Sequence, residues 1–170
     1  MSGALHALRS HWPEYMMEAW GLGMFMVSAG LFTILLEYPG SPVHQAITDP
    51  DVRRALIGLA MGLTAIGIIY SPWGQQSGAH LNPAVTLTFM RLRKVAVWDA
   101  LFYIIAQIAG GTLGVVLVAL TLGKIFTDSP VNYAATLPGE QGAIIAFIAE
   151  YAISLGLMLT VLWVSNTEKI

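Results

Sequence analysis

The residues from Ser77 to Thr86 read Ser-Gly-Ala-His-Leu-Asn-Pro-Ala-Val-Thr and are the part of the chain best suited to handle a polar solute. Asn82 is a favoured helix N-cap and Pro83 is favoured at the first helical position, so a helix is predicted to begin here. The amide of Asn82 supplies two N–H donors, and a helix N-terminus carries about half a positive charge. Such a group can orient a neutral, oxygen-bearing solute and repel cations and protons.

Three titratable side chains are the other candidates for chemistry. Glu18 and Glu150 lie inside otherwise apolar stretches, where a carboxyl group is costly in lipid and is expected to face the protein interior. His80 could anchor a loop or line a pore. A single histidine without a second ligand nearby is a poor metal candidate, so neither a metal nor another cofactor is expected. An intramembrane enzyme or a proton-coupled carrier would have to use these three groups. No nucleophile is paired with a base at a recognisable spacing, so the chain is not expected to be an enzyme.

The composition places these residues in a membrane. Of 170 residues, 56% are hydrophobic and only 11% are charged, whereas soluble domains contain about 25% charged residues. The net charge of −2 and a single short basic cluster give nucleic-acid binding no support. The absence of cysteine excludes disulfides and thiolate metal sites. The lipid bilayer is the expected partner.

Four stretches are apolar and long enough to cross about 30 Å of hydrocarbon as helices. In lipid only helices and closed barrels satisfy the hydrogen bonding of their backbone groups. The sequence lacks the period-2 alternation typical of a barrel. The predicted fold class is therefore an all-α membrane protein, with residues 1–170 in a single domain. The small-residue pairs Gly58 with Gly62 and Gly110 with Gly114 predict close helix contacts. The predicted spans are residues 15–36, 55–70, 97–122 and 141–164.

Residues 71–91, between the second and third spans, do not fit a simple span. The segment is turn-like up to His80, and the helix predicted over 83–91 covers nine residues, which is roughly 14 Å or about half a bilayer. This pattern predicts a re-entrant loop that dips to mid-membrane and returns as a half-helix. Irregular backbone at that depth must be buried in protein or line a water-filled cavity. The alternative interpretation is an interfacial turn followed by a short surface helix.

The basic residues predict an orientation. Cytoplasmic loops of membrane proteins carry an excess of lysine and arginine. Both termini are therefore expected in the cytoplasm, with the first span acting as its own insertion signal. The side that holds both termini carries Arg9, Arg91, Arg93, Lys94 and Lys169, and the other side carries Arg53, Arg54 and Lys124.

The segment 77–86 resembles the first Asn-Pro-Ala box of the aquaporin (major intrinsic protein) family. Glu18 in the first span and the stretch 103–111 are similar to that family as well. The loop 132–139 before a Glu-bearing fourth span is similar to its bacterial members. The box residues are Asn82, Pro83 and Ala84.

The resemblance implies a fold built from two inverted repeats, each of three spans and a half-helix. Residues 1–122, with the half-helix 83–91, would be the first repeat, and 141–164 the first span of the second. The implied function is a passive channel for water or small neutral solutes such as glycerol. The complete protein would be a homotetramer, and a bacterial inner membrane is its expected location.

Relative to the family, the 170 residues lack the last two spans, the second Asn-Pro-Ala box and the arginine that follows it. The expectation is therefore an incomplete half-pore. The alternative is a nonconducting fragment, or a half-channel subunit that requires a complementary chain.

The resemblance also assigns roles within the loop. Asn82 would donate hydrogen bonds to the passing solute, and the backbone carbonyls of Gly78, Ala79 and His80 would accept them. Glu18 and Glu150 would accept backbone N–H groups from re-entrant loops. Glu150 would hold the loop present here, and Glu18 would face the loop that is missing.

Met61, in the second span, would lie near the outer constriction of the pore by the same resemblance. An apolar, flexible side chain at that place leaves both water and glycerol open as solutes.

Overall fold

The computed structural model describes residues 3–167, which form helices and connecting turns without a strand. They include four helices long and apolar enough to cross a membrane, which confirms the all-α membrane fold. The chain divides into two compact units, residues 1–134 and residues 135–170. Each unit is described by itself, and the single domain expected over 1–170 stays a prediction.

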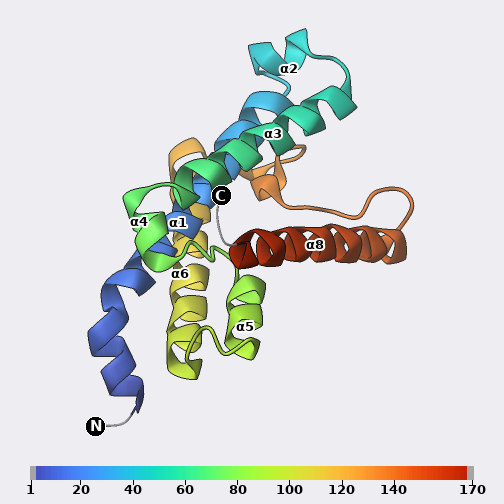
Figure 1. Cartoon of the computed structure of the whole chain (residues 1–170). Coiled ribbons are helices and arrows are strands. Elements are labelled where there is room, and N and C mark those ends of the chain that lie inside the picture. Colours follow the sequence, from blue (N-terminus) through green and yellow to red (C-terminus); the bar gives the residue numbers. More distant parts are fainter. Residues whose placement is uncertain (1–2, 168–170) are drawn as a thin grey trace. The chain divides into compact units, whose positions relative to one another are not determined.

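The first unit holds seven helices and a 3-10 turn, η1 (Asn132–Ala134), and the second holds α8 (Ala143–Asn166) (Figure 1). The helices of the first unit are α1 (Gly3–Glu37), α2 (Pro42–Ala46), α3 (Pro50–Ile69), α4 (Pro72–Ser77), α5 (Pro83–Arg91), α6 (Val97–Leu122) and α7 (Lys124–Thr127).

Four helices begin at a capping residue followed by proline. The side-chain oxygen of each cap accepts a hydrogen bond from a backbone N–H of the first turn, and the proline stands where no N–H is needed. The helix start predicted at Asn82-Pro83 is confirmed, and α5 ends at Arg91 as predicted. The other three pairs are Ser41-Pro42, Asp49-Pro50 and Ser71-Pro72, at the starts of α2, α3 and α4.

The observed spans differ from the predicted ones mainly at their first residues. α6 has the predicted bounds, whereas α3 begins at Pro50 because Asp49 caps it there. α1 begins at Gly3, well before residue 15. Its added turns pack on the start of α6, since Ala7 is buried and a Cβ at Gly3 would lie 3.4 Å from Trp98. The short helix α4 also occupies part of the stretch predicted as turn, where the Ser71 cap starts it.

α1 bends at His11, whose φ of −125° and ψ of 17° are not helical. Pro13 lacks the N–H that would continue the hydrogen-bond ladder, which accounts for a bend at this place. The His11 Nδ1 and the Tyr15 hydroxyl lie 2.9 Å and 2.6 Å from the same oxygen of Asp99 on α6. The bend is therefore fixed against α6.

Glycines let α1 and α6 approach closely above this bend. A Cβ at Gly110 would lie 1.9 Å from the backbone oxygen of Ala19, and one at Gly114 would lie 2.5 Å from the backbone oxygen of Gly23. Only residues without a side chain permit such an approach, so the close contact predicted for Gly110 and Gly114 is confirmed.

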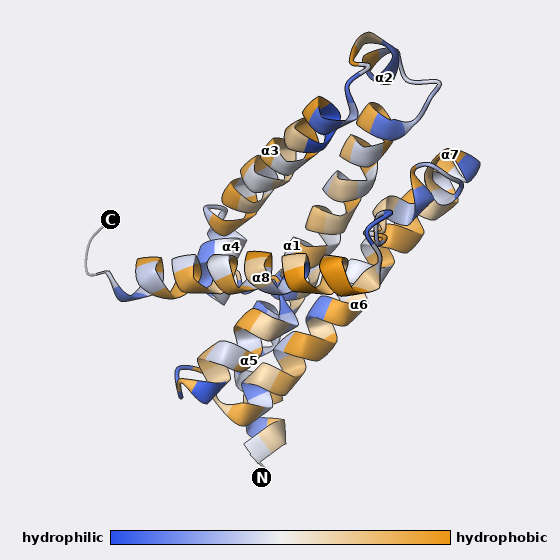
Figure 2. Ribbon diagram, turned by 90° about the vertical axis from the view of Figure 1, so that its right-hand side faces the viewer, coloured by the Kyte–Doolittle hydropathy of each residue, from blue (hydrophilic) through white to orange (hydrophobic). Residues whose placement is uncertain are grey.

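α3 packs less tightly on α1. The hydroxyls of Ser28 and Thr64, 2.8 Å apart, join the two helices. A Cβ at Gly58 or Gly62 would meet nothing within 4 Å, so the contact predicted for this pair is not seen among the described residues. Figure 2 shows hydrophobic residues along the middle of α1, α3 and α6 and hydrophilic ones at the start of α3 and in the α5–α6 turn. This distribution suits helices that cross lipid.

A small apolar core closes the far end of the first unit. Val118, Phe126 and Val131 are at most 2% exposed. The ring of Phe126 lies 3.0 Å from the place of a Cβ at Gly30, so this glycine gives α7 room against α1.

Candidate functional site

The loop between α4 and α5 has an unusual backbone. Gly78 ends α4 with φ of +86°, as glycine commonly does at a helix C-terminus. Ala79 and Leu81 also have positive φ, +44° and +51°, a conformation uncommon for residues that carry a Cβ. Backbone strain of this kind persists only where the surrounding structure imposes it. The loop must therefore be held by its neighbours.

Glu18 of α1 holds this loop. One carboxylate oxygen accepts hydrogen bonds from the Ser77 hydroxyl at 2.8 Å and from the backbone N–H of His80 at 2.9 Å. The other oxygen accepts from the backbone N–H of Leu81 at 2.8 Å. Successive N–H groups gathered by left-handed residues form a concave nest for an anion. The side chain of Glu18 is fully buried, and these donors replace the water that the carboxylate loses.

The expectation that Glu18 faces a missing loop is wrong. The side chain meets the loop 77–82, which was the role expected of Glu150. The reason lies in the tertiary packing. α1 packs along α6 and contacts α4, so the buried face of α1 meets the segment that follows α4. Glu150 lies exposed on α8, in the second unit, and its role stays a prediction.

Three further residues support the loop, and none of them was predicted to do so from the sequence. The Gln107 amide nitrogen donates to Glu18 at 2.8 Å and lies 3.1 Å from the Thr86 hydroxyl. The Tyr103 hydroxyl donates to the backbone oxygen of Ser77 at 2.8 Å. A polar amide inside an apolar span must face the protein interior, so the sequence around Gln107 could have predicted a buried polar contact at this residue. Tyr103 lies one helical turn before it, on the same face.

His80 is fixed from two sides. Its ring stacks on Phe89 of α5 with centroids 5.0 Å apart and meets the edge of Tyr103 at 5.2 Å. Its Nδ1 lies 3.1 Å from the Thr86 hydroxyl. Of the two roles considered for His80, these contacts favour anchoring the loop.

The side-chain amide of Asn82 caps α5 through its oxygen alone. The oxygen accepts a hydrogen bond from the backbone N–H of Ala84 at 2.8 Å and so caps α5. The nitrogen makes no hydrogen bond within the described part of the chain, and the residue is exposed. The backbone oxygens of Gly78, Ala79 and His80 likewise accept none from residues 3–167. Within the described residues, the segment 78–82 therefore holds one amide donor group and three carbonyl acceptors without partners.

A polar cavity of about 250 Å³ adjoins the loop at Ser77 and His80. It could hold several water molecules, each of which occupies about 30 Å³. Among the residues that the structure describes, no three histidine or acidic side chains are grouped to hold a metal ion. The remaining lining includes His11, Glu14, Tyr15, Lys94, Asp99 and Tyr103.

Met61 lies half-buried on α3. No hydrogen bond or aromatic contact joins it to the loop 77–82 within the described residues. Its expected place near an outer constriction stays a prediction.

Known proteins resemble this chain along most of its length. The family model described as Major intrinsic protein matches residues 8–170. The chain is 35% identical to Probable aquaporin NIP4-2 of Arabidopsis thaliana over 140 residues, which is 82% of this chain and 47% of that protein. It is 36% identical to Glycerol uptake facilitator protein-like 6 of Lactiplantibacillus plantarum over 143 residues, 81% of this chain and 62% of that protein.

An aquaporin of Encephalitozoon intestinalis is 32% identical over 156 residues, 87% of this chain and 54% of that protein. No solved structure matches the chain significantly. The chain spans about half the length of the plant relatives it matches.

Proposed function

The chain belongs to the major intrinsic protein family, and on that premise we propose that it lines a passive channel for water or small neutral solutes such as glycerol. It is an integral, multi-pass membrane protein. Passage of this kind needs no covalent step and no cofactor.

The observation that most supports the proposal is the loop held by Glu18. Its strained backbone leaves the Asn82 amide nitrogen and three backbone carbonyl oxygens without partners in the described part of the chain. The start of α5 adds the positive end of a helix dipole. Donors, acceptors and a partial positive charge together suit a neutral solute and disfavour cations.

Water and glycerol both fit this arrangement. The oxygens of either solute accept from Asn82, and their hydroxyl hydrogens donate to the carbonyls of Gly78, Ala79 and His80. The relatives include proteins named for each kind of transport. We propose both solute classes and no choice between them.

We further propose that these 170 residues form one wall of the channel. The matched region is 47% of the first plant relative, and the sequence holds one Asn-Pro-Ala box. Facing walls would come from further protein. The competing candidate is a half-channel subunit, or a fragment, that conducts nothing alone.

Stopped-flow light scattering on proteoliposomes that contain this chain alone tests whether the facing walls must come from another protein. Osmotic shrinkage faster than that of empty liposomes would show that copies of the chain complete a conduit. Shrinkage no faster than that of empty liposomes would reject a complete channel and show that the chain needs further protein to conduct.

The Asn82→Asp variant tests the solute contact in whichever assembly conducts. Aspartate keeps the cap on α5 but loses the N–H donors and adds a negative charge. We expect solute flux to fall roughly fivefold, equivalent to one hydrogen bond of about 1 kcal/mol, with a rise in cation leak. Asn132→Asp makes the same change in η1 and should alter neither quantity. Unchanged water and ion permeability in Asn82→Asp would remove Asn82 from the mechanism.

For the complete protein we propose both termini in the cytoplasm and a homotetrameric assembly. The placement of basic residues supports the orientation. The relatives come from plants, microsporidia and a bacterium, so no particular organism or organelle is proposed, and a bacterial inner membrane has no support.

A further inference from the structure

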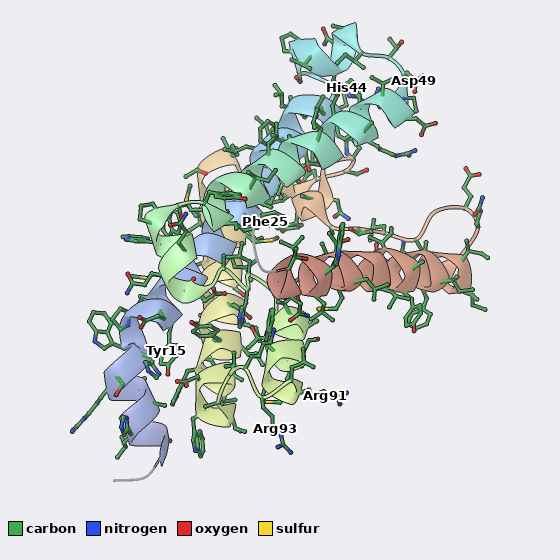
Figure 3. All side chains as sticks on the ribbon, in the orientation of Figure 1. Tyr15, Phe25, His44, Asp49, Arg91 and Arg93 are labelled. Carbon is green, nitrogen blue, oxygen red and sulfur yellow. The ribbon has the colours of Figure 1, made fainter. Side chains whose placement is uncertain are left out.

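One end of the first unit carries arginines that the protein itself leaves unpaired. Arg9, Arg91 and Arg93 are exposed, and none of their guanidinium groups makes a hydrogen bond or ion pair within residues 3–167. Figure 3 labels Arg91 and Arg93 at the end of α5, at the same end of the unit as the start of α1. The start of α1 lies beside the start of α6, since a Cβ at Gly3 would lie 3.4 Å from Trp98.

The acidic side chains at this end are turned inward. Asp99 binds His11 and Tyr15, and its side chain is 18% exposed. Glu14 accepts a hydrogen bond from Gln76 at 3.2 Å and lines the polar cavity. Negative groups therefore do not neutralise the exposed arginines, and this end presents positive charge outward.

The opposite end differs although it also holds basic residues. Arg53 is only 8% exposed and donates to Glu37 and to the backbone oxygens of Ile47 and Thr48. Arg54 pairs with Asp51 at 2.8 Å. The two ends of the first unit therefore differ more in unpaired positive charge than in their number of basic residues.

Apolar side chains accompany the unpaired arginines. Leu5, Leu8 and Trp12 are 48%, 41% and 57% exposed. The spacing of Leu5, Leu8 and Arg9 places these three residues on one face of α1, and Trp12 follows directly after the bend at His11. Trp98, at the start of α6, is 46% exposed. Amphipathic rings and long basic side chains at one level are typical of the region where acyl chains meet headgroups.

We propose that this end of the first unit binds the phosphate-bearing headgroups of anionic lipids. Arg9, Arg91 and Arg93 contact the phosphates while Leu5, Leu8 and Trp12 enter the upper acyl region. The charge left outward by the folded chain selects anionic over zwitterionic lipid. This binding is independent of solute passage.

The test measures binding of phosphatidylglycerol and phosphatidylcholine to the full chain in neutral detergent, by native mass spectrometry. We expect the chain to prefer phosphatidylglycerol, and R91Q/R93Q to lower that preference by about fivefold for each arginine removed. R54Q/K124Q removes two positive charges from the other end and should leave the preference unchanged. Both pairs are exposed, so circular dichroism should show equal helix content.

A second measurement uses the unchanged chain. Raising the salt from about 0.1 M to about 1 M shortens the Debye length from about 10 Å to about 3 Å and should abolish the preference. The proposal is overturned if R91Q/R93Q keeps the preference, if R54Q/K124Q loses as much, or if the preference resists salt.

Discussion

The Glu18→Leu variant is expected to lose the fixed loop and much of the stability of the first unit. Four donors meet the Glu18 carboxylate: Ser77, His80, Leu81 and Gln107. Each buried donor left without an acceptor costs about 1–3 kcal/mol, so the free energy of unfolding should fall on the order of 5 kcal/mol. Thermal unfolding in detergent, followed by circular dichroism, measures the change.

Two comparisons make this prediction specific to the loop. Glu18→Gln keeps one acceptor oxygen and should show a smaller loss than leucine. Glu140→Leu changes an exposed carboxylate and should have little effect. Hydrogen exchange of the His80 and Leu81 amides should accelerate in Glu18→Leu. Unfolding and exchange like those of the parent chain would contradict the assigned contact.

The second large effect is expected for Gly110→Ala. The added methyl would lie 1.9 Å from the backbone oxygen of Ala19, and backbone cannot move aside as a flexible side chain can. Overpacking typically costs about 1–3 kcal/mol, and a backbone clash belongs at or above the upper value. The thermal midpoint in detergent should fall accordingly.

Gly62→Ala is the matched control for this change. A Cβ there meets nothing within 4 Å, and alanine exceeds glycine in helix propensity by about 1 kcal/mol. Its midpoint should stay the same or rise slightly. Equal midpoints for the two variants would contradict the close approach of α1 and α6.

The local features of the fold were readable from the sequence because they depend on neighbouring residues. Asn82 and Pro83 set the start of α5, and a polar residue paired with proline starts three other helices. The apolar stretches predicted the four spans, and α6 has the expected bounds. The extra turns of α1 were missed because Trp98, beside which they start, lies far along the sequence.

The hydrogen-bond partners of a buried carboxylate depend on tertiary packing and could not be predicted from neighbouring residues in the sequence. Glu18 and Glu150 both look like loop anchors in sequence, since each is one acid in an apolar span. Only the packing of α1 on α6 and α4 shows that Glu18 meets the loop 77–82. The positive φ of Ala79 and Leu81 also follows from that contact, because neither residue type favours it alone.

We expect α5 to start deep in the membrane and to end at its surface, and spin-label depth measurements test this placement. The chain contains no cysteine, so single cysteines at Ala84, Leu87 and Arg91, all exposed, can carry the nitroxide without background. In bilayers, the Arg91 label should lie at the headgroups and the Ala84 label roughly 10 Å deeper, following a rise of about 1.5 Å per residue. Equal, shallow depths at all three positions would make α5 a surface helix and would exclude a re-entrant loop.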